Sequence, residues 1–508
     1  MTGDIIIEMK PPVPTLALYL MPRMQDLVFI MVFLLGIISG PRFFGDGDPG
    51  RHIIIGKIIV TEHTIPKTDS FSFTKTGQSL TTTEWLSEAL YAIPYLFMGL
   101  NGVVLLAAIL IAVTITLIFR ETVIQSNSYL VAGLLALWAT AATFFHWLAR
   151  PHLFSWLVFA IWVPAMDRVV RGEKVPIWQF PLIMLVWANL HGGFIVGFLV
   201  WFAYLAGWIV EYLFNKDIRP TTAIFKRLLA VGGLSFLASF VNPSMLKLWS
   251  NVFGHVGDST LMQQQIDWRS PDFHAPNVWP FLLLIALMLF ALAIQKRKPS
   301  GGQLFLLIGL TLLGLYSVRN IPFFVIACSP IIGSLLGLRL ADSKIFGNIS
   351  KTIHTMQTTL RGMTWSLLTV ILAAAALLSG QRFDSGNIGN TFNPDQFPVH
   401  AADWLAANPQ TGNMFNEFTW GGYLLYRFWP EQRVFIDGQT DFYGAELVNE
   451  YLTTLRVQNG WQDILQKYDI SWAIIPTDFP MVEALQDKLG WQIIYQDNTA
   501  TILHKPWN

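Results

Sequence analysis

The chain has 508 residues, of which 53% are hydrophobic and only 13% are charged. Charged residues normally make up about 25% of a soluble domain, so this composition excludes an ordinary soluble protein and predicts that lipid surrounds most of the apolar surface. The formal net charge of zero excludes the basic field that nucleic-acid binding requires. The single cysteine, Cys328, excludes an intrachain disulfide framework.

The chain begins with a charged segment, residues 1–25, which lacks the short apolar run and small-residue cleavage site of a signal peptide. We expect this segment to stay in the cytoplasm and the first apolar run to be retained as a span. Because a helix needs roughly 20 mostly apolar residues to cross a bilayer, the sequence predicts a transmembrane domain over residues 26–382 with about eleven spans. The predicted spans are 26–44, 100–119, 128–147, 152–168, 177–190, 193–214, 228–245, 278–295, 303–318, 321–339 and 363–380.

The first outside loop, predicted over residues 45–99, opens with two carboxylates, Asp46 and Asp48, among glycines. Flanking glycines let the backbone approach a ligand closely, and two such carboxylates could share a divalent cation. Either one could also serve as general base to an acceptor hydroxyl or amine. An ordinary Asx turn at a helix end explains the same pattern, so the spacing alone leaves both interpretations open.

Later in this loop, the run from Trp85 to Phe97 has aromatic and apolar residues at helical spacing. This pattern predicts a helix that lies in the membrane interface before the second span. A simple extension of that span explains the run equally well. Further along the chain, His191-Gly192-Gly193 separates two spans and predicts a tight re-entrant turn.

The orientation follows from the distribution of Lys and Arg, which are enriched in cytoplasmic loops. The loops that would face the cytoplasm hold Arg120, Arg168, Arg171, Lys174, Lys216, Arg219, Lys226, Arg227, Lys296, Arg297, Lys298, Arg339, Lys344, Lys351 and Arg361. The opposite short loops hold only Arg150, Lys247, Arg269 and Arg319. This predicts a multi-pass protein of the plasma (inner) membrane with a cytoplasmic N-terminus and an extracytoplasmic C-terminal domain.

Several polar residues gather at the predicted outside ends of spans, among them Arg150, His152, His191, Arg269 and Arg319. A guanidinium at this boundary suits a phosphate, which it can bind through two parallel hydrogen bonds. Snorkelling toward lipid headgroups, helix capping and hydrogen bonding within the core explain each residue separately. Their common location on one face favours a shared binding role.

The composition changes after the last span. Residues 383–394, rich in Gly, Asn and Asp, form a predicted linker, and residues 395–508 form a predicted small soluble α/β domain. Strands are expected at 433–436, 472–475, 491–495 and 499–504, and helices at 399–407 and 445–455.

The order of these features resembles the GT-C superfamily of membrane glycosyltransferases. The resemblance rests on the acidic pair after the first span, the interface helix, about eleven spans and a C-terminal soluble domain outside. More closely, the chain resembles a group of largely uncharacterised prokaryotic glycosyltransferase-like membrane proteins. The matching segments are Asp46 and Asp48 with His52 four residues after the second Asp, then 65–72, 84–86, 150–151, 189–193, 317–320 and 416–423.

The resemblance implies transfer of a sugar from a polyprenyl-phosphate donor to a lipid, glycan or protein acceptor on the non-cytoplasmic face. Asp46 or Asp48 would be the base, with a divalent cation, if one is used, held by the same pair. The candidates for binding the donor phosphate or substrate are His52, Arg150, His152, His191, Arg269 and Arg319. One departure concerns 49–51, where Pro49-Gly50-Arg51 replaces the aromatic residues of the relatives and makes the site geometry less transferable.

A different class of function fits part of the pattern: a non-enzymatic membrane protein, either a transporter of amphiphilic substrates or an assembly factor with an outside partner-binding domain. A transporter should have broken helices with ionisable groups at mid-membrane, often in repeated halves. The polar residues here lie at one edge, and no internal repeat is present, which favours the transferase.

Overall fold

The computed structural model describes residues 18, 20–214, 221–257, 266–360, 362, 364–379 and 390–506. The predicted cytoplasmic segment up to residue 17 therefore lies outside the described residues. So do residues 383–389 of the predicted linker and three of the loop cations used for the orientation, Lys216, Arg219 and Arg361.

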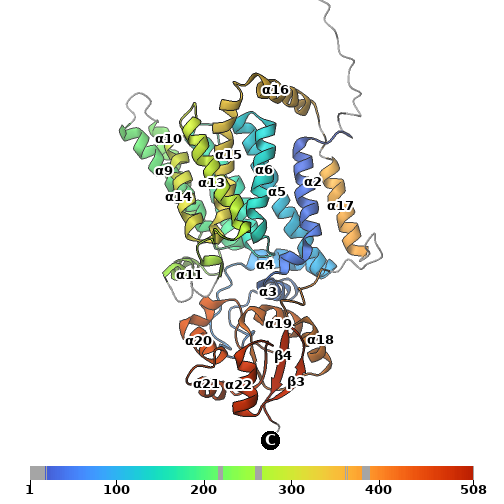
Figure 1. Cartoon of the computed structure of the whole chain (residues 1–508). Coiled ribbons are helices and arrows are strands. Elements are labelled where there is room, and N and C mark those ends of the chain that lie inside the picture. The colour runs from blue at the N-terminus through green and yellow to red at the C-terminus, as the bar shows by residue number, and fades with distance from the viewer. Residues whose placement is uncertain are drawn as a thin grey trace, which may run out of the picture.

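A bundle of apolar helices makes up most of the molecule (Figure 1). Every apolar run predicted from the sequence falls on a helix. These helices are α2 (Met24–Ile38), α5 (Leu100–Ser126), α6 (Tyr129–Thr143), α7 (His152–Val170), α8 (Gln179–Leu190), α9 (Phe194–Phe214), α10 (Thr222–Ala238), α13 (Trp279–Ile294), α14 (Gly301–Tyr316), α15 (Ile321–Leu340) and α17 (Thr364–Ser379).

The predicted count of eleven spans is not confirmed. Among the described residues, six helices are long and apolar enough to cross a bilayer, or seven if α16 (Lys344–Thr359) and α17 form one bent span. Three shorter apolar helices, α2, α8 and α14, accompany them. Proline shortens two of the predicted spans, because α2 ends before Gly40-Pro41 and α10 before Asn242-Pro243. The bundle nevertheless makes the chain a multi-pass membrane protein.

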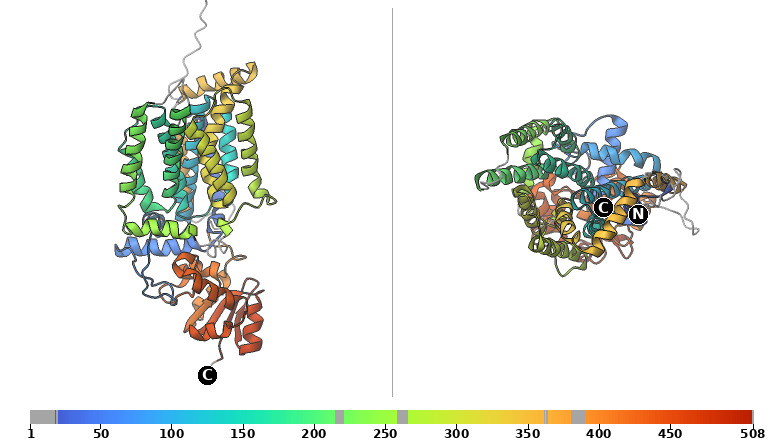
Figure 2. Two further views of the ribbon diagram at one scale, coloured as in Figure 1. Left: turned by 90° about the vertical axis from the view of Figure 1, so that its left-hand side faces the viewer. Right: turned by 90° about the horizontal axis from the view of Figure 1, so that it is seen from above.

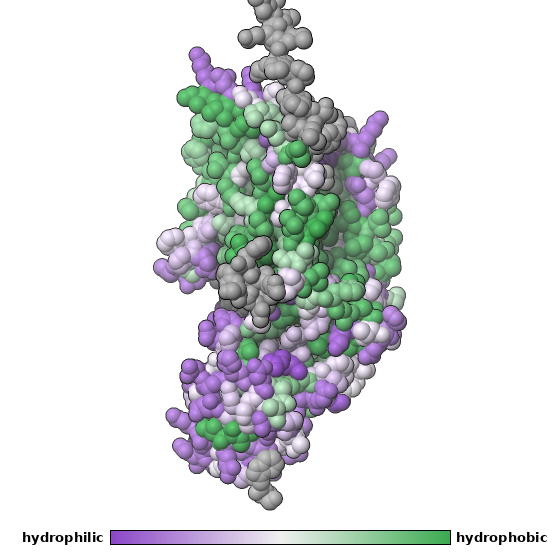
Figure 3. Space-filling model, turned by 90° about the vertical axis from the view of Figure 1, so that its right-hand side faces the viewer, coloured by the Kyte–Doolittle hydropathy of each residue, from purple (hydrophilic) through white to green (hydrophobic). Residues whose placement is uncertain are grey.

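The surface agrees with a membrane environment. Figure 3 shows a broad apolar surface on one face of the bundle and a hydrophilic surface over the C-terminal part of the chain. Large apolar side chains on the outside of the bundle are exposed, for example Phe202 at 62%, Phe290 at 57% and Leu367 at 63%. Such exposure is unfavourable in water but favourable in lipid.

Two helices cross one end of the bundle, α3 (Asp48–Glu62) and α4 (Trp85–Met98) (Figure 2). Helix α4 confirms the helix expected at 85–97, whereas α3 occupies a stretch that we treated as loop. Its first turn contains Pro49, which is tolerated there because the first N–H groups of a helix have no intrahelical partner. The two helices touch at Gly56, where a Cβ atom would lie 2.0 Å from the carbonyl oxygen of Glu88.

The C-terminal unit, residues 399–504, lies beyond α3 and α4 (Figure 1). Its four strands, β1 (Asn413–Asn416), β2 (Ile470–Pro476), β3 (Gln492–Gln496) and β4 (Ala500–His504), form a sheet in the order β1-β2-β4-β3. Only β1 and β2 are parallel. Helices α18 (Val399–Ala407), α19 (Gly421–Phe428), α20 (Thr440–Leu455), α21 (Trp461–Lys467) and α22 (Pro480–Leu489) accompany the sheet.

The strand predicted at 433–436 is wrong, and β1 was missed. Val434 makes only an isolated bridge with Ser72. The N–H of Phe435 donates to the side-chain oxygen of Asn416 at 2.8 Å instead of to a neighbouring strand. The β-rich composition of 433–436 therefore belongs to a buried connection and not to a strand. The side chain of Asn416 accepts the hydrogen bond that a neighbouring strand would otherwise have accepted.

Candidate active site

A cavity of about 910 Å³ opens between the end of the bundle and the C-terminal unit. The membrane part contributes Asp46, Asp48 and Arg150 to its wall, and the C-terminal unit contributes Thr419 and Gly438. Sequence segments more than 300 residues apart thus meet at one site. This volume is in the range of small-molecule binding sites, about 300–1,000 Å³.

The local sequence explains how the two carboxylates point into this cavity. The short 3₁₀ helix Gly40–Phe44 ends at Gly45, and Asp46 then accepts a hydrogen bond through Oδ1 from the backbone N–H of Asp48 at 3.1 Å. This is an Asx turn, and it leads directly into α3. The turn uses only one oxygen of Asp46. The pair can therefore form an Asx turn and still offer a carboxylate oxygen as a base.

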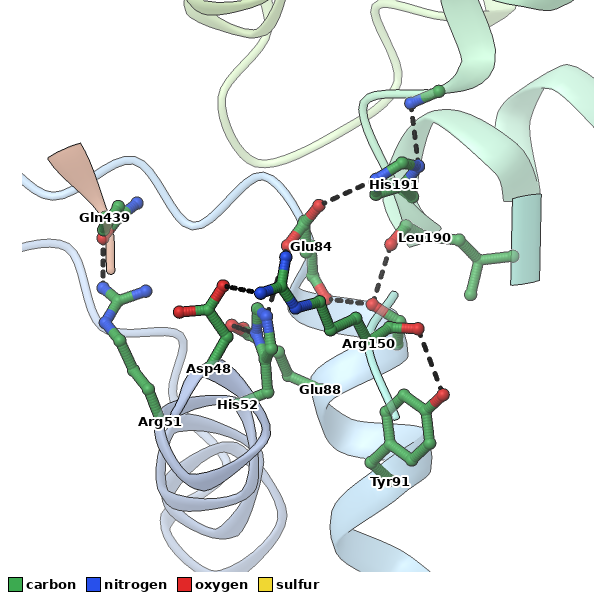
Figure 4. A network of polar contacts seen from close by, with 12 residues as sticks. Asp48, Arg51, His52, Glu84, Glu88, Tyr91, Arg150, Leu190, His191 and Gln439 are labelled. Atoms are coloured by element: carbon green, nitrogen blue, oxygen red, sulfur yellow. Dashed lines mark hydrogen bonds and ion pairs between the residues drawn. The ribbon is translucent and has the colours of Figure 1, made fainter. Parts of the chain in front are cut away.

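Arg150 joins the carboxylates at the cavity wall, and Figure 4 shows its guanidinium beside Asp48. Its Nη2 atom contacts Asp46 and lies 3.1 Å from Oδ2 of Asp48, while its Nη1 atom lies 3.2 Å from Oδ2 of Asp267. The backbone carbonyl of Arg150 accepts a hydrogen bond from the Tyr91 hydroxyl at 3.1 Å, which fixes this part of the chain. One guanidinium therefore faces three carboxylates.

Burial and the neighbouring charges shift the pKa values of this group. Burial raises the pKa of Asp46 to about 6, Arg150 opposes the shift, and Asp48 reinforces it. Burial alone would also raise the pKa of Asp267, but the nearby His146, Arg150 and Arg319 hold it below its usual value. The pKa of Arg150 is raised, because the carboxylates outweigh its desolvation. Asp46 thus holds a proton at a higher pH than an ordinary aspartate does.

A second cavity of about 160 Å³ lies on the other side of Arg150. His52, Glu84, His191 and Arg319 line it. The guanidinium carbon of Arg319 lies 4.3 Å from the ring centroid of Trp268, a cation–π contact that orients the side chain. Two guanidinium groups, Arg150 and Arg319, therefore border a small polar space.

Hydrogen bonds define the state of His191. Its Nδ1 atom accepts from the N–H of Gly193 at 3.0 Å and lies 2.8 Å from Oγ of Ser155. The proton of the neutral ring is therefore on Nε2, which lies 3.5 Å from Oε1 of Glu84. Burial, together with the positive charge of Arg319, lowers the pKa of His191 to about 3, so the ring is neutral at physiological pH.

His52, from the second turn of α3, stands between two carboxylates (Figure 4). Its Nδ1 atom lies 3.0 Å from Oε1 of Glu88, and its Nε2 atom lies 3.9 Å from Oε2 of Glu84. Burial opposes protonation of His52, but the hydrogen bond to Glu88 and the charge of Glu84 raise its pKa overall. Burial raises the pKa of Glu84 to about 7.

Known proteins resemble this chain in structure and not in sequence. No family profile and no curated protein matches the sequence. The oligosaccharyltransferase of Archaeoglobus fulgidus superimposes with a TM-score of 0.58 at 11% identity, over 91% of this chain and 69% of that one. ArnT from Cupriavidus metallidurans, in a structure bound to undecaprenyl phosphate, gives a TM-score of 0.51 at 13% identity over 94% and 97%.

The chain has the fold of the GT-C superfamily. The fold resemblance predicted from the acidic pair, the interface helix and the apolar runs is thereby confirmed. A further structure of the archaeal enzyme, named AglB and in complex with an inhibitory peptide and a dolichol-phosphate, matches with a TM-score of 0.56 at 12% identity over 89% of this chain and 69% of that one.

Within this GT-C fold, the structure brings most of the predicted site residues together. Those that border one or both cavities are Asp46, Asp48, His52, Arg150, His152, His191 and Arg319. Arg269 borders neither cavity, and its side chain is exposed. Its backbone carbonyl instead accepts a hydrogen bond from the N–H of Val318 at 3.0 Å.

Sequence reasoning missed Asp267, Glu84 and His146 as members of the site. Asp267 stands only two residues before Arg269, and an acidic side chain beside a candidate phosphate ligand was the available signal. His146 ends a span four residues before Arg150, and its ring lies 4.8 Å from that of His152. These residues come from separate helices, so no local motif relates them.

In this structure the carboxylates of the site contact a guanidinium. Across the described ranges, no group of three or more His, Cys, Asp or Glu side chains is placed to hold a metal ion. A divalent cation at Asp46 and Asp48 would have to displace Arg150 from both. We therefore derive no step through a metal ion.

Proposed function

We propose that this protein is a membrane glycosyltransferase that moves a sugar from a polyprenyl-phosphate donor to a lipid, glycan or protein acceptor. The observation that supports the proposal most strongly is the group of Asp46, Asp48 and Arg150 at the wall of the 910 Å³ cavity. It joins a base and a phosphate ligand at the point where the apolar bundle meets the hydrophilic C-terminal unit. A lipid-linked donor requires such a boundary.

In the proposed reaction, an acceptor hydroxyl or amine enters the larger cavity and gives its proton to Asp46 or Asp48. The acceptor atom forms a bond to the anomeric carbon of the sugar as the bond from that carbon to the phosphate oxygen breaks. The electron pair stays on the leaving polyprenyl phosphate. Arg150 and Arg319 stabilise the charge that develops there.

The surplus of carboxylates gives Arg150 a second role. In the free protein its guanidinium is shared among Asp46, Asp48 and Asp267. A donor phosphate competes for the same N–H groups, and each carboxylate that it displaces from Arg150 becomes a stronger base. Donor binding thus prepares the carboxylate for the acceptor.

We place this reaction on the non-cytoplasmic face of the inner membrane, with residues 395–508 as an extracytoplasmic domain and the N-terminus in the cytoplasm. The loop cations support this orientation, and the site lies at the end of the bundle that carries the C-terminal unit. Reporter fusions after Asn508 and at the N-terminus test it. A C-terminal reporter that is active only in the cytoplasm would disprove the orientation.

The activity itself is tested with the purified protein in lipid nanodiscs. We expect it to transfer labelled sugar from an undecaprenyl-phosphate-linked donor to a lipid or peptide acceptor pool, and the Asp46→Asn, Asp48→Asn double variant to transfer none. If the wild-type protein binds undecaprenyl phosphate but transfers no sugar from any donor of this class, the transferase proposal fails. The non-enzymatic alternative would then be supported.

A further inference from the structure

The C-terminal unit reaches the helix that bears Asp48 without any side chain between the two backbones. A Cβ atom on Gly47 would lie 2.2 Å from the carbonyl oxygen of Thr419, and one on Gly50 would lie 2.5 Å from that of Gly422. In return, a Cβ atom on Gly422 would lie 2.3 Å from the carbonyl oxygen of Gly47. The first turn of α3 and the start of α19 are therefore in direct backbone contact.

A buried ion pair secures the same helix one turn further on. The Nε atom of Arg51 lies 3.1 Å from Oδ2 of Asp437, and the two side chains are only 9% and 1% exposed. The Nη2 atom of Arg51 donates to the side-chain oxygen of Gln439 (Figure 4). Asp437 also accepts a hydrogen bond through Oδ1 from the N–H of Gln439 at 2.9 Å. Both partners are thus held in one orientation.

Between these two anchoring residues stands Gly438, which faces Asp48 itself. A Cβ atom on Gly438 would lie 2.0 Å from Oδ1 of Asp48, and Gly438 also lines the larger cavity. Its backbone is not in the left-handed region that favours glycine. The absence of a side chain at 438 therefore leaves room for the Asp48 carboxylate and is not required by the turn.

We propose that the segment Asp437-Gly438-Gln439 of the C-terminal unit positions Asp48 for sugar transfer. Asp437 and Gln439 fix the rotation of α3 through Arg51, three residues from Asp48, and Gly438 leaves the space that the carboxylate occupies. This inference rests on the proposed function. It makes these three residues positioning residues, because none of them is required to touch the reacting atoms.

Energetics favour a positioning role over a purely stabilising one. Burying two charges costs free energy that their attraction recovers only in part, so an apolar pair would hold the two parts together as well or better. The hydrogen bonds from Arg51 to Gln439 and from Gln439 to Asp437 add direction, because each donor must face its acceptor in a narrow range of geometry. Directional restraint matters next to a base, since a shift of about 1 Å can slow a reaction by about 100-fold.

The steric part of the proposal is tested with Gly438→Ala, which leaves the backbone free but displaces the Asp48 carboxylate. We expect kcat to fall by about 10- to 100-fold, with the melting temperature unchanged. Gly309→Ala in α14 is the matched control, because no atom lies within 4 Å of its added Cβ. A Gly438→Ala variant with the kcat of the Gly309→Ala control would overturn this part.

The ion pair is tested with Arg51→Gln, Asp437→Asn and the double variant. Each single change leaves one buried charge unpaired and should lower the melting temperature, whereas the double change removes both charges and should restore it. We expect kcat to stay low in the double variant, since Arg51 and Asp437 then no longer restrain the rotation of α3. A double variant with both the melting temperature and the kcat of the wild type would show that the pair is only structural.

Hydrogen exchange gives a readout that does not depend on transfer. The amides of α3 should exchange faster in the double variant than in the wild type, while those of α9, which is remote from the pair, should not change. A wild-type protein without transferase activity refutes the proposed function. Hydrogen exchange at α3 then tests by itself whether Arg51 and Asp437 restrain this helix. Unchanged exchange at α3 in the double variant contradicts the inference.

Discussion

Ion pairs flank both ends of helix α7, but they are built differently. At the end away from the C-terminal unit, Arg168 pairs with Glu121 at 2.7 Å, and the Nε atom of Arg171 lies 2.8 Å from Oδ2 of Asp167. Each of these cations has one carboxylate partner. At the other end, Arg150 alone faces three carboxylates.

The two ends of α7 also differ in their hydrogen bonds and in their position relative to the two cavities. Asp167 also accepts hydrogen bonds from the Tyr204 hydroxyl at 3.1 Å and from the side-chain amide of Gln303 at 3.2 Å, so its oxygens are fully used. Neither Asp167 nor Arg168 borders the two cavities, whereas Arg150 borders both. Buried charge alone does not identify a functional site. Unbalanced charge beside an open cavity is what makes the Arg150 end the candidate site.

The strongest way to break this comparison is to remove the cation at each end. We expect Arg150→Ala to lower kcat/KM for the lipid-linked donor by about 1,000-fold, because the leaving phosphate loses a charged hydrogen-bond donor. Arg168→Ala should leave kcat/KM within about twofold, since Arg168 lies away from both cavities. Steady-state transfer assays on the two variants measure the difference, and equal losses in both would remove the distinction between the two ends.

At the Asp167 end of α7 we expect a substitution to change stability and not transfer. Asp167→Asn breaks the contact with Arg171 and disturbs two further hydrogen bonds, so we expect it to lower the free energy of unfolding by about 1–3 kcal/mol. Thermal unfolding in detergent and a transfer assay on the same sample provide the measurement. A variant that keeps its stability but loses transfer would indicate that this end also takes part in function.

The raised pKa of Asp46, about 6, predicts a pH dependence if Asp46 is the base. A base must be deprotonated, so transfer should be constant well above pH 6 and fall toward tenfold per pH unit below it. The Asp46→Asn variant should lose this limb together with most of its activity. If the limb persists in Asp46→Asn and disappears in Glu84→Gln, it belongs to Glu84, whose pKa is about 7.

The smallest predicted effect is a gain in stability. Because the folded state raises the pKa of Asp46 to about 6, the folded protein binds the proton of Asp46 more tightly than the unfolded chain does, and ionised Asp46 costs stability above pH 6. This cost fades as the pH falls toward 4. We therefore expect Asp46→Asn to be more stable than wild type at pH 7.5 by about 1 kcal/mol or less, a difference that shrinks at pH 5. Thermal unfolding at the two pH values checks both signs.

Much of the fold follows from sequence patterns that act locally. The apolar runs, the helix at Trp85 and the turn at His191 were predictable, because hydropathy and glycine punctuation determine them within a few residues. Helix α3 was missed, since Gly and Pro in its first turn are typical of a loop. Its helical conformation is stabilised by tertiary contacts, such as the close approach of Gly56 to α4, which the sequence does not reveal.

The site was predictable only in part for a related reason. Asp46, Asp48 and Arg150 were identified from their residue types and their common face, and the structure places them in contact. Asp267, Glu84 and the role of Asp437 depend on how distant segments approach one another. Arg269 shows the opposite limit, because a cation at the predicted boundary can still lie outside the two cavities of the site.

The most direct test of the account compares three Asp→Asn variants, at positions 46, 48 and 167, in one transfer assay from an undecaprenyl-phosphate-linked sugar. The account predicts that at least one of Asp46→Asn and Asp48→Asn loses transfer by 100-fold or more, about the effect of removing a general base, while Asp167→Asn keeps its kcat. Full transfer by both site variants would contradict the claim that this carboxylate group is the centre of an active site.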